Sequence, residues 1–100
     1  MSIDGIDAET KRKIVGILEL LFPGAKVYLY GSRARGDFKP NSDIDIALDA
    51  HNKKPLHLGE AQGLLSALNT PYSVDLVDIN FASESFKSTI TKDWVLWNTK

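Results

Sequence analysis

The sequence predicts an α/β (α+β) protein with a small mixed β-sheet of three to four strands and helices packed on it. Apolar residues recur at three- and four-residue steps in segments that are expected to be helical. Short runs rich in β-branched and aromatic residues separate these segments and indicate strands. Such alternation is typical of helices packed on a sheet. One hundred residues can build one modest core, so residues 1–100 are expected to form a single domain.

The first half of the chain begins with a helix that is expected from residue 8 to about Phe22. Asp7 is a suitable N-cap, and Pro23-Gly24 ends the helix because proline and glycine interrupt helical geometry. A strand is expected over Lys26–Tyr30, and residues 32–35 then form a short helical turn. The helix has one apolar stripe, which consists of Ile14, Ile17, Leu18 and Leu21.

The second half of the chain adds two strands and two helices. Ile44–Leu48 and Ser73–Asp78 are expected to be strands, and the leucine-rich segment His57–Leu68 is expected to be a helix. Phe81–Thr91 is expected to form the last helix. The apolar run Trp94–Trp97 is either an edge strand or a final helical turn. Its aromatic side chains are expected in the core, and the alternative is an exposed patch for a partner or a homodimer.

Two aspartates, Asp43 and Asp45, mark the second strand. Side chains alternate along a strand, so both carboxylates are expected on one face while the neighbouring isoleucines face the core. Two charges about 4 Å apart repel by roughly 4 kcal/mol at an effective dielectric of about 20, and a hard divalent cation removes this cost. The pattern favours an Mg²⁺ site, although the polar face of an ordinary amphipathic strand would look the same.

A third carboxylate, Asp75, interrupts an otherwise apolar strand, where an isolated charge is costly unless it has a partner. Asp78 lies at the end of this strand and is expected to be a turn residue. If the third strand lies beside the second, Asp43, Asp45 and Asp75 converge. Three carboxylates suffice for two Mg²⁺ ions about 3.5–4 Å apart, an arrangement that supports phosphoryl or nucleotidyl transfer.

A Gly31-Ser32 turn directly follows the first strand. Backbone N–H groups and the Ser32 hydroxyl can hold phosphate oxygens at such a turn, although an ordinary turn has the same composition. The spacing from Gly31 to Gly36 fits a P-loop, but Asp37-Phe38 stands where that motif requires lysine and serine or threonine. A P-loop is therefore excluded.

Taken together, these residues resemble a known signature. The run Tyr30-Gly31-Ser32-Arg33-Ala34-Arg35-Gly36, followed by Ser42-Asp43-Ile44-Asp45, is similar to the motif of the DNA polymerase β-type nucleotidyltransferase superfamily. It is most similar to the small stand-alone members, the minimal nucleotidyltransferases (MNT). The motif covers residues 30–45, and Asp75 together with the chain length extends the match across nearly the whole chain.

This resemblance implies a metal-dependent transfer of AMP from ATP to an acceptor, with release of pyrophosphate. Asp43 and Asp45 would bind two Mg²⁺ ions. Asp75 would complete one metal site and help to activate the acceptor hydroxyl. The resemblance thus implies an enzyme, a nucleotidyltransferase whose catalytic and metal-binding residues are these three aspartates.

The resemblance also implies how the nucleotide is held. Gly31 and Ser32 would contact the triphosphate. Arg35, and with it Arg33, would neutralise phosphate charge by bidentate hydrogen bonding, although arginines at a surface are commonly only solvated. Ser42 is grouped with these residues because it would orient the loop or Asp43.

Members of this small family commonly resemble the antitoxin of a toxin–antitoxin pair whose partner is a helical HEPN ribonuclease. The resemblance implies that the chain adenylylates a tyrosine of such a toxin and so neutralises it. Two alternatives stay open, namely transfer to a small-molecule acceptor and a non-catalytic antitoxin that acts by binding alone. Nearly all residues belong to the expected catalytic core, which favours an acceptor that a partner protein brings.

Composition limits the remaining classes. A net charge of −1 argues against a protein that binds long nucleic acid, and the absence of cysteine excludes disulfides and thiolate metal sites. No apolar run approaches the roughly 20 residues needed to cross a bilayer. The first five residues lack the apolar stretch of a secretory signal, so a cytoplasmic location is expected. A homo-oligomer is left open.

Overall fold

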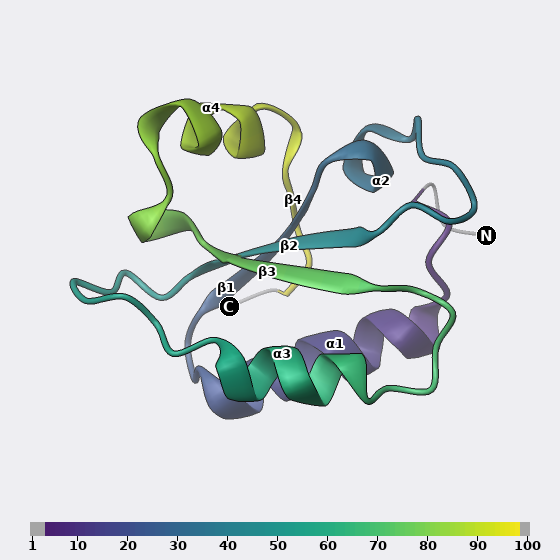
Figure 1. Cartoon of the computed structure of the whole chain (residues 1–100), viewed down its shortest axis with the longest axis horizontal. Helices are drawn as coiled ribbons and strands as arrows, with labels where there is room; N and C mark the ends of the chain where they lie inside the picture. The colour runs from purple at the N-terminus through teal and green to yellow at the C-terminus, as the bar shows by residue number, and fades with distance from the viewer. Residues whose placement is uncertain (1–3, 99–100) are drawn as a thin grey trace.

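The computed structural model describes residues 4–98, which form a mixed four-stranded β-sheet with helices on both faces. The helices are α1 (Ala8–Leu21), α2 (Ser32–Arg35), α3 (Gly59–Ser66) and α4 (Glu84–Asp93), and the strands are β1 (Lys26–Tyr30), β2 (Ile44–Asp49), β3 (Val74–Asp78) and β4 (Val95–Leu96). Helices α1 and α3 cover one face of the sheet, while α2 and α4 lie on the other (Figure 1). The predicted α/β fold with a small mixed sheet is therefore confirmed.

The strand order in the sheet is β3-β2-β1-β4. Strand β1 pairs antiparallel with β2 and with β4, whereas β2 pairs parallel with β3. Helix α3 lies in the connection from β2 to β3, because parallel neighbours require a crossover rather than a hairpin. Of the two structures predicted for Trp94–Trp97, the edge strand is correct, since Val95 and Leu96 pair with β1.

Helix α1 begins where the sequence predicts. The Asp7 carboxylate accepts hydrogen bonds from the backbone N–H of Thr10 at 3.0 Å and from its hydroxyl at 2.7 Å. These bonds satisfy helix N-terminal donors that would otherwise lack partners. The apolar stripe of α1 packs with α3 and one face of the sheet into the main core, whose buried members include Ile14, Leu18, Val27, Leu29, Ile44, Ile46, Leu48, Ala61, Leu65, Val74 and Trp97.

The opposite face of the sheet has a smaller apolar cluster beneath α4. Tyr30, Ala47, Ile79 and Ile90 are buried there, and Trp94 packs against them. The Trp94 ring stacks on Tyr28 with 3.7 Å between centroids and 11° between planes. The two tryptophans thus serve different clusters, because Trp97 lies in the main core. Both pack internally, as predicted, while Val95 and Leu96 remain 46% and 44% exposed.

The last helix differs from its prediction at its start. Phe81 does not begin it but ends a 3₁₀ turn over Ile79–Phe81, whose N-terminus the Asp78 carboxylate caps. Helix α4 begins at Glu84, after Ser83 accepts a hydrogen bond from the Phe86 N–H. The two capping side chains, Asp78 and Ser83, therefore start two separate helical segments, where apolar spacing alone predicts one helix. Helix α3 is also shorter at each end than the predicted 57–68.

Within residues 4–98, no helix combines the length and apolar character that crossing a bilayer requires.

Candidate active site

Three polar side chains form a row across the sheet on the face opposite the main core. Asp45 of β2 pairs in register with Asp75 of the parallel strand β3. Asp45 also pairs with Tyr30 of the antiparallel strand β1. Cross-strand partners project from the same face, so the order along the row is Asp75, Asp45, Tyr30. The predicted adjacency of the second and third strands, on which the convergence of carboxylates depends, is confirmed.

Asp43 lies one residue before β2, at the end of the sheet where the loop after α2 enters the strand. It is exposed, whereas Asp45 is partly buried. The next residue, Ile44, is completely buried, and its N–H donates to the Ser73 carbonyl at 2.8 Å. Asp43 therefore lies at the exposed end of the row. It directly precedes Ile44, the first residue of β2 that pairs with β3.

The electrostatics of Asp45 show that the carboxylates act on one another. Burial, followed by the neighbouring charges of Asp75 and then Asp43, raises the pKa of Asp45 from 3.8 to about 6. Arg35 opposes the shift by lowering this pKa. Like charges that crowd one site disfavour the ionised form of each, and a cation between them reverses this effect.

Tyr30 completes the row, and sequence reasoning did not select it. Burial, followed by the charges of Asp45 and Asp75, raises the pKa of Tyr30 to about 12. Its hydroxyl therefore stays protonated at neutral pH. Phe86 of α4 packs edge-on against its ring, with 6.1 Å between centroids. The alternation of Val27 and Leu29 into the main core is the sequence signal that places Tyr30 on the opposite face.

Gly31 brings the turn after β1 against Asp45. Its backbone has φ 79° and ψ −155°, a conformation that is essentially restricted to glycine. A Cβ at this position would lie 2.6 Å from Oδ2 of Asp45, so any side chain would displace the carboxylate. Helix α2 follows directly, and Ser32 is its first residue. The turn therefore lies beside Asp45 in the carboxylate row.

Arg35, at the end of α2, is exposed and stands near the row. Its Nε donates to Oδ2 of Asp37 at 3.2 Å, and its side chain is 43% exposed. The positive charge of Arg35 lowers the pKa of Asp45. The guanidinium is thus a cation at the rim of the site.

Arg33, two residues earlier, has a different position from the one predicted. It is 1% exposed, and its guanidinium donates to the backbone carbonyls of Asp4, Pro40 and Ser42. A buried guanidinium with these acceptors is not available to a nucleotide phosphate, so that part of the prediction is wrong. Arg33 and Arg35 are two residues apart in α2, which is about 200° around a helix, so their side chains point to different sides.

The remaining polar residues near the strands have structural partners. The Ser42 hydroxyl accepts from the Lys39 N–H at 2.8 Å and closes a turn before Asp43. Asp78 accepts from the N–H groups of Asn80 and Leu56 and from the Asn52 amide, as expected for a turn residue. Asp78 therefore belongs to the loop network at the far end of β3 and not to the carboxylate row.

The donor set suits Mg²⁺, which prefers oxygen ligands and is usually held by one or two carboxylates together with substrate phosphates. Within residues 4–98, no group of three acidic or histidine side chains forms a ready-made metal cage. Two carboxylates, Asp43 and Asp45, beside the Gly31 turn fit an ion that arrives with a nucleotide.

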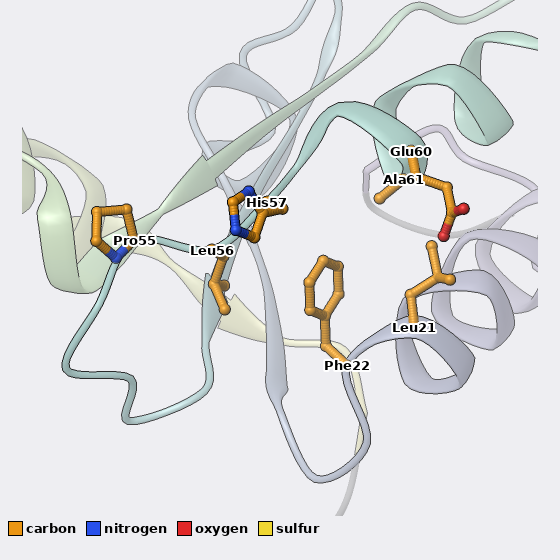
Figure 2. A pocket seen from close by; sticks show the side chains of 7 residues that line it. All are labelled: Leu21, Phe22, Pro55, Leu56, His57, Glu60 and Ala61. Atoms are coloured by element: carbon orange, nitrogen blue, oxygen red, sulfur yellow. The ribbon is translucent and has the colours of Figure 1, made fainter.

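A separate hollow of about 320 Å³ lies between the end of α1 and the start of α3. Figure 2 shows its lining, which is mainly apolar and includes Phe22, Leu56 and the exposed side chains of His57 and Glu60. These helices cover the face of the sheet opposite the carboxylates (Figure 1). The hollow therefore takes no part in the carboxylate site.

A row of carboxylates on adjacent strands, beside a glycine-serine turn, is chemically suited to metal-assisted nucleotidyl transfer. The family described as polymerase beta, nucleotidyltransferase matches residues 12–100. The chain belongs to this family. The resemblance inferred from residues 30–45 is confirmed, and the chain is a nucleotidyltransferase.

Two relatives are particularly informative. A probable protein adenylyltransferase MntA of Haemophilus influenzae is 33% identical over 98 residues, which cover 95% of this chain and 84% of the relative. The protein adenylyltransferase MntA of Shewanella oneidensis is 38% identical over 94 residues, which cover 90% of this chain and 66% of the relative. The chain is thus similar to enzymes that carry the name protein adenylyltransferase.

Solved structures agree with these relatives. A chain of a toxin–antitoxin crystallised with AMP-PNP superposes with a TM-score of 0.69 at 30% identity, covering 90% of this chain and 73% of that one. A complex of a tri-AMPylated Shewanella oneidensis HEPN toxin with its MNT antitoxin gives a TM-score of 0.63 at 26% identity, covering 92% and 71%. The fold that positions the carboxylates is therefore shared with proteins of toxin–antitoxin complexes.

Proposed function

We propose that this chain is an Mg²⁺-dependent antitoxin that transfers AMP from ATP to a tyrosine hydroxyl of a partner HEPN toxin. The observation that carries this proposal is the register that sets Asp45 beside Asp75, with Gly31 against Asp45. The names of the relatives, protein adenylyltransferase, and the AMPylated HEPN toxin in a similar complex support the type of acceptor.

In this proposal Asp43 and Asp45 hold the metal ions, and Asp75 completes one of the two sites. Bound Mg²⁺ would neutralise phosphate charge around the reacting phosphorus. Gly31 leaves room for the triphosphate beside Asp45, and the Ser32 hydroxyl donates to a phosphate oxygen. Arg35 supplies positive charge at the rim. Its effect on the pKa of Asp45 supports this placement.

The proposed transfer forms one bond and breaks one bond. The acceptor oxygen attacks the α-phosphorus of ATP, and the bond from this phosphorus to the oxygen that bridges the α- and β-phosphates breaks, which releases pyrophosphate. Asp75 takes the proton of the acceptor hydroxyl. Asp75 is suited to this role because it lies on the outer strand β3 and is exposed, where an acceptor can approach it.

The test is a mass measurement on the acceptor. The chain is incubated with ATP, Mg²⁺ and the product of the reading frame adjacent to its own, and the mass of that protein is measured before and after. The expected result is a gain of one or more AMP units on the partner, located to tyrosine by fragmentation. A partner of unchanged mass, with ATP intact, would contradict the proposal.

A double variant, Asp43→Asn with Asp45→Asn, separates catalysis from binding. The proposal expects this variant to leave the partner unmodified and toxic in cells. Asp93→Asn is the matched control, because Asp93 lies at the end of α4, outside the carboxylate row. If the double variant still neutralised the partner completely, the chain would act by contact alone.

A cytoplasmic location is part of the proposal, because the reaction consumes ATP and modifies an intracellular toxin. Fractionation of cells that express the chain tests it, and the expected result is recovery with the ATP-containing soluble fraction.

A further inference from the structure

Arg33 is a buried cation whose three hydrogen-bond acceptors come from two parts of the chain, the segment before α1 and the turn over residues 39–42. Its Nε donates to the Ser42 carbonyl at 3.0 Å, its Nη1 to the Asp4 carbonyl at 2.9 Å, and its Nη2 to the Pro40 carbonyl at 3.3 Å. The side chain is almost completely enclosed, at 1% exposure. Hydrogen bonds to a charged donor in a buried place are among the stronger ones in proteins.

Two aromatic rings complete the surroundings of this guanidinium. The Cζ of Arg33 lies 4.6 Å from the centroid of Phe38 and 4.8 Å from that of Tyr72. The Tyr72 hydroxyl donates to the Gly5 carbonyl at 3.2 Å, which ties the same aromatic ring to the segment before α1. Gly5 has φ 71°, and a Cβ on it would lie 2.4 Å from the Phe38 ring. The residues around the guanidinium are therefore closely packed, with no room for a side chain at Gly5.

The cluster holds the backbone before Asp43, and a separate hydrogen bond holds the backbone after it. Before it, the turn from Lys39 to Ser42 is closed by the Ser42 N–H on the Lys39 carbonyl at 2.9 Å, and Arg33 holds two carbonyls of this turn. After it, the Ile44 N–H donates to the carbonyl of Ser73, the residue before β3. Asp43 itself is exposed. Its placement thus depends on neighbours that are fixed and not on contacts of its own carboxylate.

We propose that Arg33 is a positioning residue that fixes Asp43 by fastening the turn over residues 39–42 to the segment before α1. Arginine suits this role because its planar guanidinium presents five donors in a rigid fork, and lysine has a single mobile ammonium. The consequence for catalysis rests on the proposed function. The consequence for the order of the turn does not.

The experiment compares Arg33→Lys with the unchanged chain by amide hydrogen exchange, and Arg12→Lys is the matched control. Arg12 is exposed on α1 and pairs only with Glu9 among the interactions the structure gives it. The amides of Lys39 and Ser42 report on the turn, and the amide of Leu29 in β1 reports on the sheet. Because one charged hydrogen bond or more is lost, exchange at Lys39 and Ser42 is expected to rise about tenfold relative to Leu29.

Activity provides the second measurement. With saturating ATP and the partner protein, turnover of Arg33→Lys is expected to fall about tenfold, and the Mg²⁺ concentration for half-maximal turnover is expected to rise. Arg12→Lys should change neither quantity. If exchange at Lys39 and Ser42 changes by the same factor as exchange at Leu29, or does not change, the proposal is overturned. The substitution would then affect the whole fold or have no effect.

Two further results distinguish the role of Arg33 from the proposed function and from a failure to fold. If even the unchanged chain transfers no AMP, the proposed function fails, and the exchange measurement alone decides the role of Arg33. If Arg33→Lys does not fold, Phe38→Leu replaces it, because it removes one ring and leaves all three hydrogen bonds. This variant is expected to raise exchange at Lys39 and Ser42 in the same direction by a smaller factor, and unchanged exchange would overturn the proposal.

Discussion

Strand β2 contributes completely buried aliphatic side chains to the face of the sheet that α1 and α3 cover, and a partly buried carboxylate to the opposite face. Ile44, Ile46 and Leu48 point into the main core, whereas Asp45 points toward Asp75 and Tyr30. On the first face, close packing removes apolar surface from water and stabilises the fold. On the second, burial and like charge disfavour the ionised form of Asp45.

The difference shows how one short strand serves stability and chemistry at once. Adjacent residues such as Asp45 and Ile46 are bonded to each other, yet their side chains lie in separate layers. The covered face stabilises a sheet whose other face carries an electrostatic cost. Substitutions on the two faces are therefore expected to change different measured quantities.

The largest effect is expected for Asp45→Asn. If Asp45 binds the metal as proposed, its loss should lower AMP transfer at least about a hundredfold, because even indirect partners of a metal commonly contribute 10- to 100-fold. Stability at pH 7 should stay equal or increase, since the substitution removes a charge that burial, Asp75 and Asp43 disfavour. Transfer assays and thermal melts check the two parts. A variant that keeps full activity would show that Asp45 does not take part in the reaction.

Ile46→Ala tests the opposite face at the next residue. The side chain is completely buried, so its removal should lower the free energy of unfolding by about 2–5 kcal/mol. Transfer per folded molecule should change little at temperatures well below the melting point. Denaturant melts and activity normalised to the folded fraction measure these quantities. Equal losses of activity and stability would mean that the two faces are not separable.

Gly31→Ala is expected to affect both quantities moderately. Its backbone conformation is strained for alanine by about 1–3 kcal/mol, and the new Cβ would meet Oδ2 of Asp45. Gly16→Ala serves as the control, because nothing lies within 4 Å of a Cβ at that position. Melts and nucleotide-binding titrations compare the two variants. Normal nucleotide binding by Gly31→Ala would contradict the close approach of the turn to the site.

The smallest effect is a pH dependence of stability. Folding raises the pKa of Asp45 from 3.8 to about 6, so the folded state binds more protons than the unfolded state between these values. Stability from this group is therefore present at low pH and decreases as pH rises from about 4 to about 6. Melting curves of the unchanged chain and of Asp45→Asn over this range should differ in slope, with the variant lacking this decrease. Identical slopes would show that Asp45 titrates normally.

Much of the fold could be predicted because its segments carry strong local signals. The stripe of α1, its Asp7 cap and the alternation in β1 and β2 agree with tertiary packing. The start of α4 was wrong because Asp78 and Ser83 each cap a separate turn, and apolar spacing does not reveal a break between two helical segments. The signal was present in Ser83-Glu84, a common start of a helix.

The candidate site was predictable in its residue types and less so in its surroundings. Asp75 is predictable because a lone carboxylate in an apolar strand is costly without a partner. Its register with Asp45 places it in the carboxylate row. The motif predicts that Arg33 contacts the nucleotide, whereas the structure buries it against the carbonyls of Asp4 and Pro40. This burial depends on the segment before α1, which is distant in sequence. No pattern within the motif carries that information.

The parallel pairing of β2 with β3 has a consequence for how the protein becomes active. Asp45 and Asp75 meet only after the whole crossover that contains α3 has closed, and parallel, non-local pairing is the slow kind of step in folding. A nascent or partly folded chain that has formed only its β1–β2 hairpin holds the Gly31 turn and Asp45 but lacks Asp75. Under the proposed function, such a chain lacks one of the three aspartates, so AMP transfer is expected only after β3 has paired with β2.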